Sequence, residues 1–177
     1  MLAGLSTPEL ASAEPQGVRP SAEAGLGRDL AGASSHGFVG AVLDWPVLSR
    51  RFELGAGVRL LAGRIEPEPA FSGFLLGRVC AHHGAWRPAS GVELELSTAH
   101  SSSTPDEPPD SFTRAFNSTG RDEVLRAHLL IEPLRFEWKQ LLFTVGAVRL
   151  GTPLDGDAGQ RVRLSVTLLR LGWTVSL

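Results

Sequence analysis

Strict alternation of apolar residues with polar or small ones recurs along this chain, and it constrains the fold more than any other feature. The cleanest stretch is 52–60, where Phe, Leu, Ala, Val and Leu alternate with Glu, Gly, Gly and Arg. A period of two places the two sets on opposite faces of a β-strand. Eight segments carry the pattern and predict an all-β chain: 18–29, 36–45, 52–60, 71–82, 92–97, 125–132, 141–150 and 161–177.

Two of these segments break the rhythm. Segment 141–150 is almost entirely apolar, so its inward and outward faces stay open at this stage. Segment 161–177 changes phase at Leu168 and Leu169, as a β-bulge would cause. Its final residues alternate up to the chain end and include Trp173. A terminal strand of this kind resembles the closing strand of an outer-membrane β-barrel.

The connections between the segments alternate in length. The links after the second, fourth and sixth segments are short, at 46–50, 83–85 and 137–139. The links after the first, third, fifth and seventh are longer, at 30–35, 64–70, 101–121 and 152–160. Bacterial outer-membrane barrels have this asymmetry, because their periplasmic turns are tight and their outer loops are long. With eight strands, both chain ends fall on the side of the short turns.

The tryptophans are expected at the short-turn end of such a barrel. Trp45 ends the second segment, Trp86 opens the fifth, Trp138 lies in the turn after the sixth, and Trp173 lies near the end of the eighth. Indole rings favour the headgroup layer of a membrane. The four residues therefore predict an aromatic girdle at one rim, with coincidence as the alternative.

Glycine placement indicates which face points inward. Gly25, Gly27, Gly55, Gly57 and Gly91 share the face that carries the charges, and a narrow eight-stranded barrel needs small residues inside. The expected interior charges are Glu23, Glu53, Arg59, Arg78, Glu93, Glu95, Arg126, Glu132 and Arg170. We interpret them as a salt-bridged filling of a barrel too narrow to conduct, with a proton or ion path as the alternative.

One pair of residues has the spacing of a nucleophile and its base. His100 and Ser102 alternate onto one strand face, so the imidazole could activate the hydroxyl. The pair is similar to the His-x-Ser arrangement of the lipid A deacylases, which are also eight-stranded outer-membrane barrels. That resemblance implies a lipid A-modifying hydrolase. A polar strand end entering a loop is the other interpretation, and we commit to no catalytic residue.

The segment 101–121 differs in kind from the rest of the chain. It is rich in Ser, Pro and acidic residues, which predicts a long polar outer loop. Phe112, Arg114 and Phe116 stand in a stretch otherwise without apolar side chains. They are candidate contacts for an extracellular ligand, and folding back over the barrel mouth is the alternative.

Composition excludes several other classes. The net charge is −2, which predicts no nucleic-acid partner, and Cys80 stands alone, which rules out an internal disulfide or a cysteine zinc site. We expect no metal and no cofactor. Residues 1–17 predict a flexible tail or the remnant of a signal peptide, since Ala11, Ser12 and Ala13 resemble a cleavage site without an apolar stretch before it.

The whole pattern resembles the small eight-stranded outer-membrane β-barrel group, which includes the transmembrane domain of outer-membrane protein A and the opacity-type proteins. The resemblance covers 18–177 as a single domain and implies an antiparallel up-and-down transmembrane barrel. It also implies a monomer in contact with lipid in the outer membrane of a Gram-negative bacterium. We expect a non-catalytic role in surface structure or loop-mediated binding. A soluble lipocalin-like carrier with an apolar cavity remains the third hypothesis beside the hydrolase.

Overall fold

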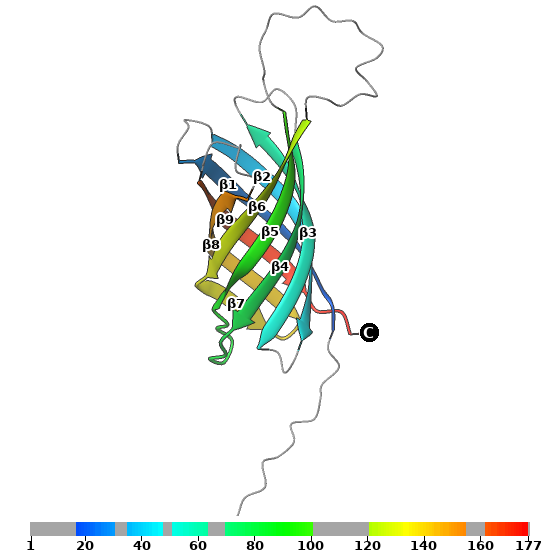
Figure 1. Ribbon diagram of the computed structural model, residues 1–177. Coiled ribbons are helices and arrows are strands. Elements are labelled where there is room, and N and C mark those ends of the chain that lie inside the picture. The colour runs from blue at the N-terminus through cyan, green and yellow to red at the C-terminus, as the bar shows by residue number, and fades with distance from the viewer. Residues whose placement is uncertain are drawn as a thin grey trace, which may run out of the picture.

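The computed structural model describes residues 17–30, 35–47, 51–63, 70–100, 121–154 and 162–176. These residues form tilted antiparallel strands that close into a barrel (Figure 1). The strands are β1 Arg19–Asp29, β2 Ser35–Val47, β3 Phe52–Gly63, β4 Ala70–Cys80, β5 Ala89–His100, β6 Arg121–Glu132, β7 Leu134–Trp138, β8 Leu141–Pro153 and β9 Arg163–Trp173. No helix long and apolar enough to cross a membrane occurs among these residues.

The barrel closes through β8. Consecutive strands pair from β1 to β6, β9 pairs with both β1 and β8, and β8 in turn pairs with both β6 and β7. Pro133 separates β6 from β7, and the two are therefore successive halves of one barrel strand. The prediction of an eight-stranded antiparallel barrel in up-and-down order is confirmed.

Inward and outward residues alternate as the period-two pattern requires. On β5, Glu93 and Glu95 are buried whereas Val92 and Leu94 are exposed, and the pairing of β5 with β6 puts Glu93 opposite His128. The polarity of the molecule is thus inverted, with charges inside and apolar side chains outside. A small apolar cluster of Val42, Phe74, Leu76, Leu130 and Ala147 also lies within the barrel.

Local irregularities cross four neighbouring strands. Pro133 interrupts β6 and β7, Gly146 on β8 has a φ of 66°, and Leu168 on β9 stays outside the ladder between Val145↔Leu169 and Ala147↔Thr167. The same step shifts the register of β1 against β9 after Ala24. The phase change predicted at Leu168 is therefore present, and Gly146 explains why the 141–150 pattern could not be assigned to faces.

The end of the barrel at which β1 begins and β9 ends is called the turn end here, and the opposite one the loop end. At the turn end, the connection between β4 and β5 spans 81–88, so the expected link at 83–85 is too short. Backbone pairing continues past the barrel through an isolated bridge between His83 and Trp86, with Gly84 at a φ of 67° in the turn. Trp86 therefore precedes β5, which begins at Ala89, instead of opening it.

Candidate functional site

The barrel interior is lined by charged side chains from every strand. All the charged residues expected inside are buried, together with five that the sequence did not assign to the interior. The additional ones are Arg19, Asp44, Arg87, Arg135 and Arg149. An unpaired charge in a confined interior costs several kcal/mol, so these groups are expected to pair with one another.

Glu53 on β3 gathers four arginines near the turn end, and we call these five residues the Glu53 cluster. Its Oε1 lies 2.7 Å from Nη1 of Arg19 and 3.4 Å from Nη2 of Arg87. Its Oε2 lies 2.9 Å from Nε of Arg78 and 2.5 Å from Nη2 of Arg135. One carboxylate thus serves as the common acceptor for cations from β1, β4, β7 and the 81–88 connection.

Other carboxylates share the positive charge of the Glu53 cluster. Arg78 also pairs with Asp44 at 2.5 Å and with Glu132 at 3.0 Å. Glu137, which is partly exposed, pairs with Arg87 and Arg19. Arg87 lies outside the strands, and burial lowers the pKa of its guanidinium to about 10 against the opposing effect of Glu53. Arg87 therefore remains charged at neutral pH.

Further along the barrel, two carboxylates and two arginines form a second group, which we call the Glu93 cluster. Arg59 on β3 donates to both oxygens of Glu93 at 2.6 and 2.8 Å and to Glu23 at 2.6 Å. Arg149 on β8 donates to Glu93 at 3.1 Å and to Glu23 at 2.9 Å. Such fork-shaped donation suits arginine and not lysine. Arg170 connects the two clusters, since it lies 3.7 Å from Glu23 and pairs at 2.9 Å with Glu132, the carboxylate that also pairs with Arg78.

Glycines make room for the larger inward side chains. The Arg59 guanidinium stacks over the ring of Phe74 at 3.7 Å from its centroid. A Cβ atom at Gly57 would collide with that ring, and one at Gly151 would collide with the imidazole of His128. Glycine on the inward face is therefore needed at these two positions to admit a ring from the neighbouring strand.

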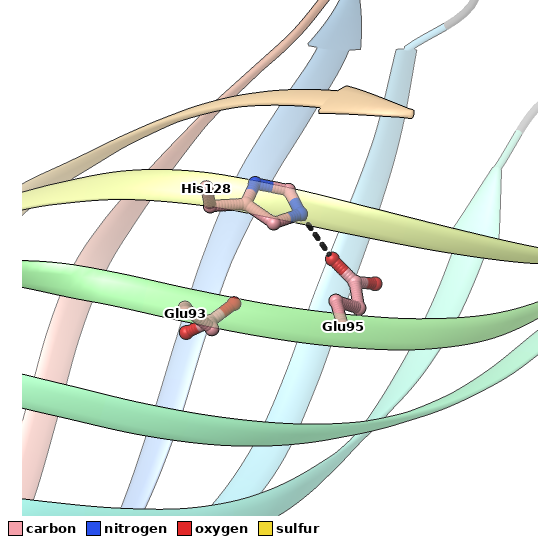
Figure 2. Close-up of side chains that lie close together, drawn as sticks. All are labelled: Glu93, Glu95 and His128. Carbon is pink, nitrogen blue, oxygen red and sulfur yellow. Dashed lines mark ion pairs between the residues drawn. The ribbon is translucent and has the colours of Figure 1, made fainter. Parts of the chain in front are cut away.

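Figure 2 shows Glu93, Glu95 and His128 side by side on β5 and β6. Nε2 of His128 lies 2.8 Å from Oε2 of Glu95, and the three residues offer ligand atoms within 4.8 Å of one another. Their types suit a divalent metal ion. However, Arg59 and Arg149 already occupy both oxygens of Glu93, so a cation would have to displace two guanidiniums. The arrangement is that of an ion-pair network.

Little space remains beside this network. A hollow of about 10 Å³ lies among His36, Phe38, Arg59, Glu95 and His128, with further residues of β3, β8 and β9 around it. That volume is on the order of a single water molecule. The interior here is packed with side chains, as expected of an eight-stranded barrel.

The outer surface carries a continuous set of exposed apolar side chains, which we call the apolar belt. Exposed fractions reach 60% for Val58 on β3, 63% for Phe71 on β4 and 61% for Val92 on β5. Further members are Val39, Leu43, Leu54, Leu75, Leu94, Leu96, Leu129, Ile131, Phe143, Leu150, Leu169 and Leu171.

The four tryptophans all lie at the turn end. Trp45 is near the end of β2, Trp138 and Trp173 end β7 and β9, and Trp86 lies in the 81–88 connection. The indole Nε1 of Trp86 donates to the carbonyl of Pro133 at 2.8 Å. Exposed fractions of 70% for Trp138 and 54% for Trp173 place these two rings on the surface beside the apolar belt.

Several sequence-predicted residues fall outside the description. The backbone of His100 pairs with Arg121, but its side chain and all of Ser102 lie outside the described part of the chain. The same holds for Phe112, Arg114 and Phe116. Their candidate roles stay predictions.

Of the five residues that sequence reasoning missed, Arg19 and Asp44 continue the unbroken alternation of β1 and β2 and could have been assigned from it. The other three share a cause. Arg149 follows the bulge at Gly146, Arg135 follows the break at Pro133, and Arg87 belongs to the connection that proved longer than expected. Each lies where the period of two is interrupted. On β3 and β5 the alternation is unbroken, so the inward-facing residues could be identified from the sequence. An arginine within a largely apolar stretch, as at Arg149, was the available signal.

Comparison with known proteins identifies the fold. No protein-family model and no curated protein matches the chain. Among solved structures, Neisserial surface protein A matches with a TM-score of 0.60 and 8% identity, over 89% of this chain and 96% of that one. The N-terminal β-barrel domain of Pseudomonas aeruginosa OprF matches with a TM-score of 0.52 and 14% identity, over 92% and 100%. The chain therefore has the fold of the small eight-stranded outer-membrane β-barrels.

Proposed function

We propose that this protein is a monomeric, non-catalytic barrel of the outer membrane of a Gram-negative bacterium, with a role in surface structure or loop-mediated binding. The observation that carries the proposal is the inverted polarity, in which Arg59 and Glu93 are buried while Val58 and Val92 are about three-fifths exposed. In water this arrangement would leave far more contiguous apolar surface than the few hundred Å² that soluble monomers tolerate.

A lipid environment removes that difficulty. Burying apolar surface is worth roughly 25 cal/mol per Å², so the apolar belt gains a large free energy when hydrocarbon replaces water around it. The strands pair in a closed ladder, so the backbone hydrogen bonds are made between neighbouring strands, as a membrane requires. The tryptophans at the turn end suit the headgroup layer on that side. This end would face the periplasm, because its connections at 48–51 and 139–140 are shorter than any at the loop end.

Binding, if present, belongs to the opposite end of the barrel. The longest connection follows β5, and its segment 101–121 holds Phe112, Arg114 and Phe116. Two phenylalanines beside a cation in a polar, proline-rich segment are suited to an extracellular ligand. The barrel would then act as the rigid support that presents this loop.

The two other hypotheses are less well supported. A lipocalin-like carrier needs an apolar cavity, whereas the inward face here carries the Glu53 and Glu93 clusters. The hydrolase hypothesis rests on the spacing of His100 and Ser102 alone. The variant His100→Ala, expressed in the source cell, is expected to leave the lipid A mass profile unchanged, and an altered profile would revive that hypothesis.

The direct test of membrane residence is the electrophoretic mobility of the detergent-refolded full chain, with and without boiling. Kinetically stable barrels keep their compact form in the detergent until heated. We expect the unboiled protein to run at a different position from the boiled one and to give a β-type circular dichroism spectrum. A chain that stays soluble and monomeric without detergent, with no mobility shift, would disprove the proposal.

A further inference from the structure

A groove interrupts the apolar belt near the loop end. Its volume is about 620 Å³, which lies within the roughly 300–1,000 Å³ typical of small-molecule sites. The outward side chains that line it are Leu26 on β1, Ala62 on β3, and Leu164 and Val166 on β9. Gly27, Arg28, Ser35, His36 and Gly37 complete its lining. We call it the rim groove.

The strand registers explain why the groove exists. Val166, Leu26, Gly37 and Ala62 are direct neighbours across β9, β1, β2 and β3, so they form one row on the outer face. In this row the large side chains of Val166 and Leu26 lie next to the small residues Gly37 and Ala62. A Cβ atom added at Gly37 would meet nothing closer than 3.8 Å, so a side chain could be accommodated there. The missing side chain at Gly37 deepens the groove at this point.

A cation stands at the end of this apolar row. Arg28 pairs in register with Ser35 on β2 and with Leu164 on β9, one step nearer the loop end than Leu26. Its side chain is exposed, on the same outward face. An occupant that complements this groove therefore has an apolar part beside Leu26 and Gly37 and an anionic part at Arg28.

We propose that the rim groove binds a single anionic phospholipid of the surrounding bilayer, with an acyl chain over Gly37 and Ala62 and the phosphate at Arg28. This inference rests on the membrane location proposed above. A guanidinium and a phosphate form charge-assisted hydrogen bonds, and the desolvated setting of a membrane rim strengthens them. A zwitterionic lipid would gain the same apolar contact but less from the cation.

The test is native mass spectrometry of the refolded, delipidated full chain titrated with phosphatidylglycerol or with phosphatidylcholine of the same acyl chains. The wild type is expected to hold one phosphatidylglycerol about tenfold more tightly than phosphatidylcholine, as one charge-assisted contact allows. Arg28→Gln is expected to abolish this preference. Gly37→Leu places a side chain in the groove where the acyl chain would lie, and it is expected to weaken the adduct of either lipid.

Matched controls separate the groove from the belt as a whole. Gly73 on β4 also faces open space, so Gly73→Leu adds the same side chain to the apolar belt elsewhere and should leave the adduct intact. Arg51→Gln removes an exposed arginine at the turn end and should preserve the lipid preference. Equal binding of the two lipids by the wild type, equal effects of Gly37→Leu and Gly73→Leu, or a dimer that Gly37→Leu dissociates would each overturn the inference.

The heat-dependent mobility shift is measured on every variant as well. A wild-type chain without the shift fails the proposed function itself. If the shift is retained while lipid selectivity is absent, only the rim groove inference fails.

Discussion

Glu53 is the residue whose charge the barrel interior depends on most. It accepts ion pairs from Arg19, Arg78, Arg87 and Arg135 and is only 1% exposed. Removing one partner of a buried pair costs about 3–5 kcal/mol, because the remaining charge stays in a poorly solvated place. Removing the charge of Glu53 would leave four buried arginines without this carboxylate.

We expect Glu53→Gln to lower the free energy of unfolding by about 3–5 kcal/mol or more, measured by urea titration of the protein folded in lipid vesicles. The matched control is Asp29→Asn. Asp29 pairs with Arg163 at 3.0 Å at the loop end, where both side chains are 13% exposed. Its loss should cost less than that of Glu53, because a single, less deeply buried pair is broken. Equal losses for the two variants would contradict the central role of Glu53.

At the scale of elements, the line of irregularities from Pro133 through Gly146 to Leu168 sets which side chains face inward. Thr144 is inward before Gly146, and Ala147 and Arg149 are inward after it, so the extra residue shifts the alternation by one position. Without that extra residue, Arg149 would point outward and could not reach Glu23 and Glu93. A shift of one residue moves all the following side chains of a strand to the opposite face of the sheet.

We expect Gly146→Val to destabilise the barrel by about 1–2 kcal/mol, because a β-branched residue is disfavoured at a φ of 66°. Gly146→Asn is the control, since asparagine tolerates the left-handed region. The measurement is the urea midpoint of each variant in vesicles. If asparagine and valine proved equally harmful, side-chain volume and not backbone conformation would be the cause.

The same elements show how far the sequence alone could lead. Alternation on β1, β3, β5 and β6 separated the two faces of each strand, and the glycines on the charged face of β1, β3 and β5 indicated that this face points inward. It could not assign Arg149, Arg135 or Arg87, which follow a bulge, a proline and an extended turn. Pair partners such as Glu53 with Arg135 are separated by 82 positions, and they depend on barrel closure and not on local pattern.

At the scale of the whole molecule, the depth of a belt residue in the membrane should govern the cost of charging it. Leu94 lies midway along β5 and is 47% exposed, whereas Leu141 begins β8 at the turn end and is 59% exposed. An arginine on the lipid face costs about 2–4 kcal/mol at the midplane and about 0–1 near the interface.

We therefore expect Leu94→Arg to destabilise the vesicle-embedded barrel by about 2–4 kcal/mol and Leu141→Arg by about 1 kcal/mol or less, measured by urea unfolding. In a water-soluble barrel both changes would be close to neutral, since each side chain would face solvent. Equal and small effects in vesicles would therefore argue against a lipid-facing belt.

The long-range pairing of the interior also determines how such a molecule can enter a bilayer. Arg149 near one end of the chain neutralises Glu23 near the other, 126 positions away, and Arg19 reaches Glu53 across 34. A strand or hairpin that entered the bilayer alone would carry unpaired charged side chains into the hydrocarbon, each at a cost of several kcal/mol. For the membrane location proposed above, we therefore expect insertion and assembly to be one event, in which the strands cross the bilayer together while the barrel closes.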